Sequence, residues 1–145
     1  MEKEDGKVII PQEAVDRSNE VKRSRRTLRQ LPLYRDMSNL KYMVVRLYDK
    51  TPRKYTKYLD CVLNTVTEAK KCVGLGEATR DMAMRAEYLS MARIFIEDLQ
   101  DDLTILVKME MISRQTEKAM KNLAKGIVAQ CVAWRDYSND LGAKS

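Results

Sequence analysis

The stretch LSMARIFIEDLQDDLTIL, residues 89–106, decides the fold class of this chain. Leucine, isoleucine and alanine recur in it at steps of three and four, and polar residues occupy most of the positions between them. An apolar stripe with this period is typical of an α-helix that buries one face. The stripe consists of Leu89, Ala92, Ile96, Leu99, Leu103 and Leu106. We therefore expect a long helix over about residues 79–109.

Three further stripes with the same spacing occupy most of the chain after residue 32. The first consists of Leu33, Met37, Leu40, Val44 and Leu47. The second consists of Tyr55, Leu59, Val62, Val66, Ala69 and Val73. The last consists of Met120, Leu123, Ile127, Cys131, Trp134 and Tyr137. They predict helices over about residues 32–50, 52–73 and 114–138, with Ser113 as a suitable N-cap for the last.

Short breaks separate the predicted helices. Thr51 and Pro52 suit an N-cap and a first helical position, so the joint between the first two helices should be tight. Gly74 and Gly76 are expected to end the second helix, because glycine accepts the left-handed conformation that closes a helix. Short connections make neighbouring helices antiparallel. The prediction is an all-α fold, an antiparallel up-down four-helix bundle over residues 31–145.

Residues 1–30 have a different composition. Residues 17–29 carry lysine and arginine against a single acid, Glu20, and no apolar face can be drawn through them. One interpretation is a basic, partly disordered N-terminal extension. Another is an arm that becomes ordered on an RNA, DNA or protein surface, with Arg23, Arg25 and Arg26 as candidate contacts.

Composition limits the function classes. At 145 residues the chain is long enough for one domain that buries about 70% of its unfolded surface. Only five glycines and three prolines are present, which argues against an all-β fold with its recurring turns. The formal charge of +6 favours nucleic acid or an anionic surface as a partner, although many basic proteins bind neither.

The three cysteines are an odd number without a C-x-x-C spacing. There is also no N-terminal apolar run typical of a signal peptide, and no apolar stretch long enough to cross a membrane. We therefore expect a cytoplasmic protein with reduced thiols. Cys61 and Cys131 lie on or near apolar stripes, where burial is the expected role.

The sequence offers little for catalysis. It contains no histidine, which removes the commonest general base and the usual ligands of zinc and di-iron sites. We predict no catalytic residues, no cofactor and no metal, and hence not an enzyme. An acidic cluster in the third helix leaves three interpretations open: a solvated or ion-paired face, a partner contact, or a divalent-cation site. It consists of Glu97, Asp98, Asp101 and Asp102.

Basic residues gather around the predicted joint between the first two helices. They are Arg46, Lys50, Arg53, Lys54 and Lys57. A second row on the last helix consists of Lys118, Lys121 and Lys125. Because the N-terminus of a helix also attracts anions, the joint is a candidate phosphate contact, although Arg53 and Lys54 could be simple surface charges. Tyr55 and Tyr58 could stack on bases there, and Tyr55 is equally well explained as core.

Several apolar residues lie beside the stripes. They are Val45, Ile94, Phe95, Ile105, Val107, Val128 and Val132. A second apolar strip suggests contacts between subunits. The alternative is a wider core stripe within one chain.

The order of these features resembles the accessory variability determinant (Avd) proteins of diversity-generating retroelements, within a four-helix-bundle superfamily that includes ribosomal intervening-sequence proteins. The matching run extends over about residues 34–137. It contains Leu47, Thr51, Pro52, Arg53, Lys54, Glu68, Ala69, Arg85, Leu89, Ala92, Ile112, Ser113, Val132, Ala133 and Trp134. The chain lacks the Asn-Ile-Ala-Glu-Gly-like segment of the intervening-sequence branch, which favours the Avd branch.

The resemblance implies a homopentamer of four-helix protomers with a positive surface, encoded by a bacterium or phage. Such a protein would bind the reverse transcriptase of the retroelement and its template RNA, or DNA, and support mutagenic cDNA synthesis. Arg53 and Lys54 match the basic pair after the proline and would contact RNA or polymerase. The alternative is an oligomeric interaction module of the intervening-sequence type without a nucleic-acid role.

Overall fold

The computed structural model describes residues 32–143, which are almost entirely helical and contain no strand. Its elements are α2 (Pro32–Leu47), the 3-10 turns Tyr48–Lys50 and Arg53–Tyr55, α3 (Thr56–Ala78), α4 (Met82–Lys108) and α5 (Arg114–Ala143). The predicted all-α class is confirmed. The predicted N-terminal extension, residues 1–30, lies outside the described residues. No described helix is long and apolar enough to cross a membrane.

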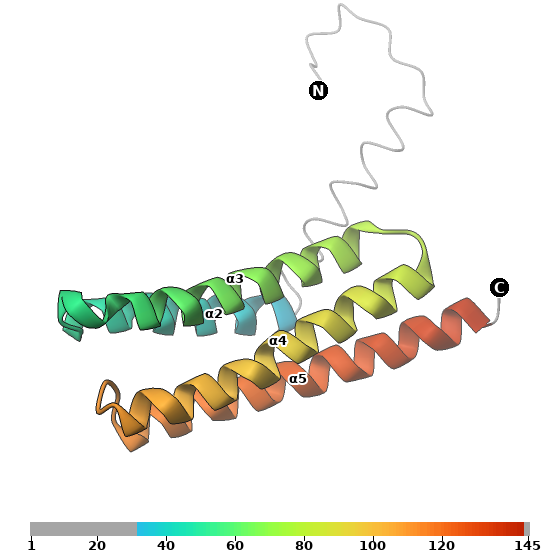
Figure 1. The fold of residues 1–145 in the computed structure, drawn as a ribbon. Helices are drawn as coiled ribbons and strands as arrows, with labels where there is room; N and C mark the ends of the chain where they lie inside the picture. Colours follow the sequence, from blue (N-terminus) through green and yellow to red (C-terminus); the bar gives the residue numbers. More distant parts are fainter. Residues whose placement is uncertain (1–31, 144–145) are drawn as a thin grey trace, which may run out of the picture.

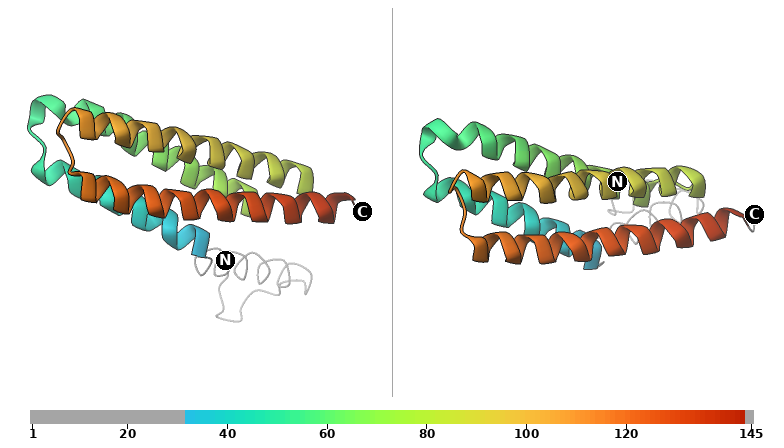
Figure 2. Two further views of the ribbon diagram at one scale, coloured as in Figure 1. Left: turned by 90° about the horizontal axis from the view of Figure 1, so that it is seen from below. Right: turned by 60° about the horizontal axis from the view of Figure 1, so that its bottom comes forward.

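The four helices lie side by side, and successive helices run in opposite directions (Figure 1). Helix α2 packs against α3 and α5, and α4 packs against the same two helices. The α2–α3 joint and the α4–α5 loop lie at the same end of the molecule (Figure 2). Helix α2 is the shortest and accompanies its neighbours over only part of their length.

The core follows the predicted stripes closely. All six stripe residues of α4 are buried, as are the first four of α2. Full burial of one such aliphatic side chain stabilises the fold by about 1.5–3 kcal/mol. Two predicted core tyrosines are exposed instead: Tyr55, which lies in the second 3-10 turn before α3 begins, and Tyr137 near the end of α5. Trp134 is half-buried and packs against the core.

The predicted end of α3 is wrong. The helix continues through Gly74 and Gly76 to Ala78, and neither glycine has a positive φ. A Cβ at Gly76 would lie 3.4 Å from the Cβ of Tyr88, so α3 and α4 are in close contact at this position. Extended backbone at Thr79 ends the helix instead, and Asp81 caps the start of α4.

The left-handed cap occurs at a residue that is not glycine. Glu110, just after α4, has φ 59°. The N–H of Met111 donates to the carbonyl of Leu106 at 2.9 Å, and the N–H of Glu110 donates to that of Val107 at 2.9 Å. This is the hydrogen-bond pattern of a Schellman motif. The predicted N-cap of α5 is confirmed, since Ser113 Oγ accepts from the N–H of Thr116 at 3.0 Å.

The α2–α3 joint is tight, but its capping differs from the prediction. Thr51 does not cap the following helix, because its hydroxyl donates backward to the carbonyl of Leu47 at 2.8 Å. Pro52 is extended (ψ 144°) and precedes a 3-10 turn, so α3 begins only at Thr56. The hydroxyl of Tyr48 donates to Asp60 on α3, and burial, together with this bond, raises the pKa of Tyr48 to about 12.

Arg85 of α4 forms hydrogen bonds at the C-terminal end of α3. Its Nε donates to the carbonyl of Gly76 at 2.8 Å, and its Nη2 donates to that of Thr79 at 3.0 Å. The guanidinium lies 5.7 Å from the centre of the Trp134 ring on α5. One side chain therefore satisfies the carbonyls at the end of α3 and ties three helices together.

Candidate nucleic-acid interface

The α2–α3 joint places five cations in one short, exposed segment. Arg46 is in the last turn of α2, Lys50 ends the first 3-10 turn, Arg53 and Lys54 are in the second, and Lys57 is in the first turn of α3. All five are exposed. We call this set the cationic joint. No side chain caps the start of α3, so the positive end of its dipole adds to the local potential.

Exposed tyrosines lie among or beside these cations. Tyr42 is 60% exposed, and its ring lies 5.7 Å from the Arg46 guanidinium, which also donates a 3.2 Å hydrogen bond to its hydroxyl. That bond raises the pKa of the Arg46 guanidinium above its ordinary value. Lys54 lies 5.0 Å from the Tyr55 ring, and Lys57 lies 5.7 Å from the Tyr58 ring. Positive charge beside exposed aromatic rings is typical of surfaces that bind single-stranded nucleic acid.

Two further cations at this end were not identified from the sequence. Lys108 ends α4 and Arg114 begins α5, and both are exposed. The loop between them lies at the same end as the cationic joint (Figure 2). In sequence they are isolated charges more than fifty residues from the joint, so only the antiparallel course of the helices reveals them.

The second predicted basic row divides into two parts. Lys121 is half-buried, pairs with Glu117 at 3.1 Å and donates to Thr104 on α4. It therefore joins α4 to α5 and is not a free surface charge. Lys118 and Lys125 are exposed on α5. The other predicted contacts, Arg23, Arg25 and Arg26, lie outside the described residues.

Three members of the acidic cluster, Glu97, Asp98 and Asp101, are exposed on α4. Glu97 pairs with Arg93 of the same helix at 2.9 Å. Asp102 is half-buried, and burial raises the pKa of its carboxyl, with smaller contributions from Asp98 and Asp101. Within residues 32–143, no three histidine, cysteine or acidic side chains converge as ligands for one ion.

The thiols differ in their surroundings. Cys131 and Cys72 are buried, and burial raises the pKa of both, that of Cys131 to about 12. Cys61 is exposed, contrary to the prediction. The buried residues of this turn of α3 are Leu59 and Val62, so Cys61 lies outside the buried stripe.

The apolar residues beside the stripes separate into two groups. Phe95, Val107 and Val128 pack against the core, as the wider-stripe interpretation requires. Val132 is half-buried, and Val45 is exposed. Ile94 and Ile105 are about half exposed on α4 (50% and 51%). The exposed Met84 and Met91 lie on the same face of that helix, by their spacing.

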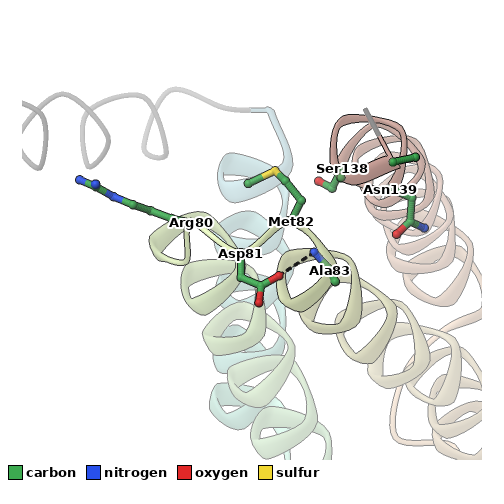
Figure 3. Close-up of a pocket in the computed structure, with 8 residues that line it drawn as sticks. Arg80, Asp81, Met82, Ala83, Ser138 and Asn139 are labelled. Carbon is green, nitrogen blue, oxygen red and sulfur yellow. Dashed lines mark hydrogen bonds between the residues drawn. The ribbon is translucent and has the colours of Figure 1, made fainter. Parts of the chain in front are cut away.

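A hollow of about 440 Å³ lies at the other end of the molecule, between the start of α4 and the end of α5 (Figure 3). The Asp81 carboxylate accepts hydrogen bonds there from the N–H groups of Ala83 and Met84, at 3.0 and 3.2 Å. Because a carboxylate already occupies this helix N-terminus, the hollow is unsuited to a second anion.

No family model matches this sequence, and no match was found among curated proteins. The functional conclusion therefore depends on the residues and their arrangement.

Proposed function

We propose that this chain is a non-enzymatic accessory protein of a diversity-generating retroelement, of the Avd type. In this proposal it is an antiparallel up-down four-helix bundle that assembles as a homopentamer. It binds the reverse transcriptase and its template RNA and supports mutagenic cDNA synthesis without performing chemistry itself.

The observation that carries the proposal is the cationic joint. It gathers five exposed cations within residues 46–57, and three exposed tyrosines lie among or beside them. The Lys108 and Arg114 side chains add charge at the same end. Phosphates contact such cations, and aromatic rings stack on bases, so this end is suited to RNA. Arg53 and Lys54, which match the basic pair after the proline in the family resemblance, belong to this set.

RNA binding tests the proposal directly. The full-length chain should bind a structured RNA with an affinity that falls steeply with salt, because phosphate contacts release counterions. Lys54→Glu should weaken binding, whereas Lys71→Glu should have a much smaller effect. Both residues are exposed lysines, but Lys71 lies towards the far end of α3. Negligible binding at about 100 mM salt, or binding independent of salt, would contradict the proposal.

The polymerase partner requires a separate test. A reverse-transcriptase gene and a pair of near-identical repeats should lie beside the gene for this chain. The encoded polymerase should co-purify with the full-length protein, and a triple charge reversal of Arg53, Lys54 and Lys57 should reduce the yield of the complex.

A second candidate function is the oligomeric interaction module without a nucleic-acid role. The exposed apolar face of α4, formed by Met84, Met91, Ile94 and Ile105, favours it. In that case Ile94→Asp should lower the mass of the native oligomer and abolish binding of the protein partner. Charge reversal at Arg53 and Lys54 should leave that binding unchanged.

A further inference from the structure

A shallow groove lies between α3 and α4 next to the cationic joint. Its volume is about 290 Å³. Its lining residues include Tyr58, Cys61 and Val62 of α3, Asp102 and Ile105 of α4, and Met109 just after α4. Tyr58 connects the groove to the cationic joint, because Lys57 of the joint lies 5.7 Å from its ring.

The chemistry of the lining restricts what the groove can hold. Its walls are an aromatic ring and aliphatic or sulfur-containing side chains, which favour an apolar surface. The Asp102 carboxylate is its charged group, and an ionised carboxylate only accepts hydrogen bonds. Exposed cations lie next to the lining residues on both helices, Lys57 beside Tyr58 and Lys108 beside Met109. A ligand that is complementary to this groove has a flat apolar face, N–H donors on one edge for Asp102, and an anionic group that can reach the flanking cations.

We propose that this groove takes one unpaired base of the bound RNA, with a guanine preferred. This inference rests on the proposed function and specifies its ligand. Guanine carries adjacent N–H donors at N1 and N2, which a carboxylate can accept together, whereas uracil offers a single N–H on that edge. These donors are engaged within a base pair, so the base must be unpaired. A groove of this size is near the lower limit for small-molecule sites, which suits one ring system.

The surrounding charges set the course of the RNA backbone. Asp98 and Asp101 are exposed on α4 within one turn of Asp102 and would repel phosphates. The backbone therefore passes on the side of Lys57 and Lys108, towards the cationic joint.

Base preference is the first test. The probes are short oligouridines in which the central base is uracil, guanine or inosine, the last of which lacks the N2 amino group. The wild-type chain should bind the guanine probe about tenfold more tightly than the uracil probe, with inosine between them. Asp102→Asn should reduce this preference to less than about twofold. Asp101→Asn removes the same charge from a neighbouring exposed position and should preserve the preference.

Stacking is the second test. Tyr58→Leu keeps an apolar side chain but removes the ring, and it should weaken binding of the guanine probe about fivefold or more. Tyr137→Leu is the matched control, since this tyrosine is also exposed but lies near the end of α5.

Cys61 provides a test that needs no substitution. It is the exposed cysteine and lines the groove, whereas Cys72 and Cys131 are buried. Bound guanine probe should slow alkylation of Cys61 severalfold, and uracil probe at equal occupancy should slow it less.

Each outcome is decisive. If RNA binding depends on salt but the guanine and uracil probes bind equally, the inference fails and the proposed function stands. If no RNA binds, both fail. If Tyr58→Leu changes the native mass and leaves RNA affinity unchanged, the groove seats a second copy of this chain, and the inference is overturned.

Discussion

At the scale of single residues, Arg85 is the clearest example of a side chain whose role could not be predicted from the sequence. It caps the end of α3 from α4, and it lies over the Trp134 ring of α5. Both residues are among those on which the proposed relation to the Avd family is based. Their geometry gives them a structural role at the end opposite the cationic joint.

Replacing Arg85 should therefore affect stability and leave RNA affinity unchanged. Arg85→Met removes charged hydrogen bonds to the carbonyls of Gly76 and Thr79 and should lower the free energy of unfolding by about 2–3 kcal/mol. Urea denaturation measures this change. Lys125→Met is the control at an exposed position and should stay within about 0.5 kcal/mol of wild type. An equal effect of both substitutions would contradict the capping role.

The buried thiol of Cys131 should make stability depend on alkaline pH. Its pKa is raised from 9.0 to about 12, so the folded protein retains a proton that the unfolded chain loses. This contribution is fully present below pH 9.0 and is lost as the pH rises towards about 12. Urea denaturation at about pH 8 and about pH 10.5 should show the loss, and Cys131→Ala should reduce it. Cys61→Ala, which removes an exposed thiol, is the control.

At the scale of elements, the two glycines of α3 do not mark its end. Helix α3 passes through Gly74 and Gly76, while the left-handed cap after α4 is Glu110 with φ 59°. The sequence pattern predicted the stripes because burial follows the helical period. It misplaced the end of α3 because the stop depends on Thr79, Asp81 and a capping arginine from another helix.

Two substitutions test this account of the glycines and helix ends. Gly74→Ala should raise the free energy of unfolding by about 0.5–1 kcal/mol, because a Cβ there meets nothing within 4 Å. Glu110→Gly should also raise it, by about 0.5–1 kcal/mol, because glycine adopts the left-handed conformation without the cost of a side chain. Thermal or urea unfolding measures both. Glu110→Ala keeps a Cβ at positive φ and should not give this gain; an equal gain would contradict the explanation.

At the scale of the whole molecule, charge is distributed unevenly. The cationic joint, Lys108 and Arg114 occupy one end, and acidic and apolar residues share the outer face of α4. The members of the joint could be predicted because they are close in sequence. Lys108, Arg114 and the groove around Asp102 could not, because only the packing of the helices brings these parts of α4 and α5 to the end that carries the joint.

The salt dependence of RNA affinity in the full-length chain is the most direct test of the central claim. The affinity should fall steeply and linearly in a plot of log K against log salt concentration. The triple variant Arg53→Glu, Lys54→Glu and Lys57→Glu should lower the magnitude of that slope by about 2 or more, because at least three phosphate contacts are lost. An unchanged slope in a folded triple variant would contradict the claim that this end of the molecule holds RNA.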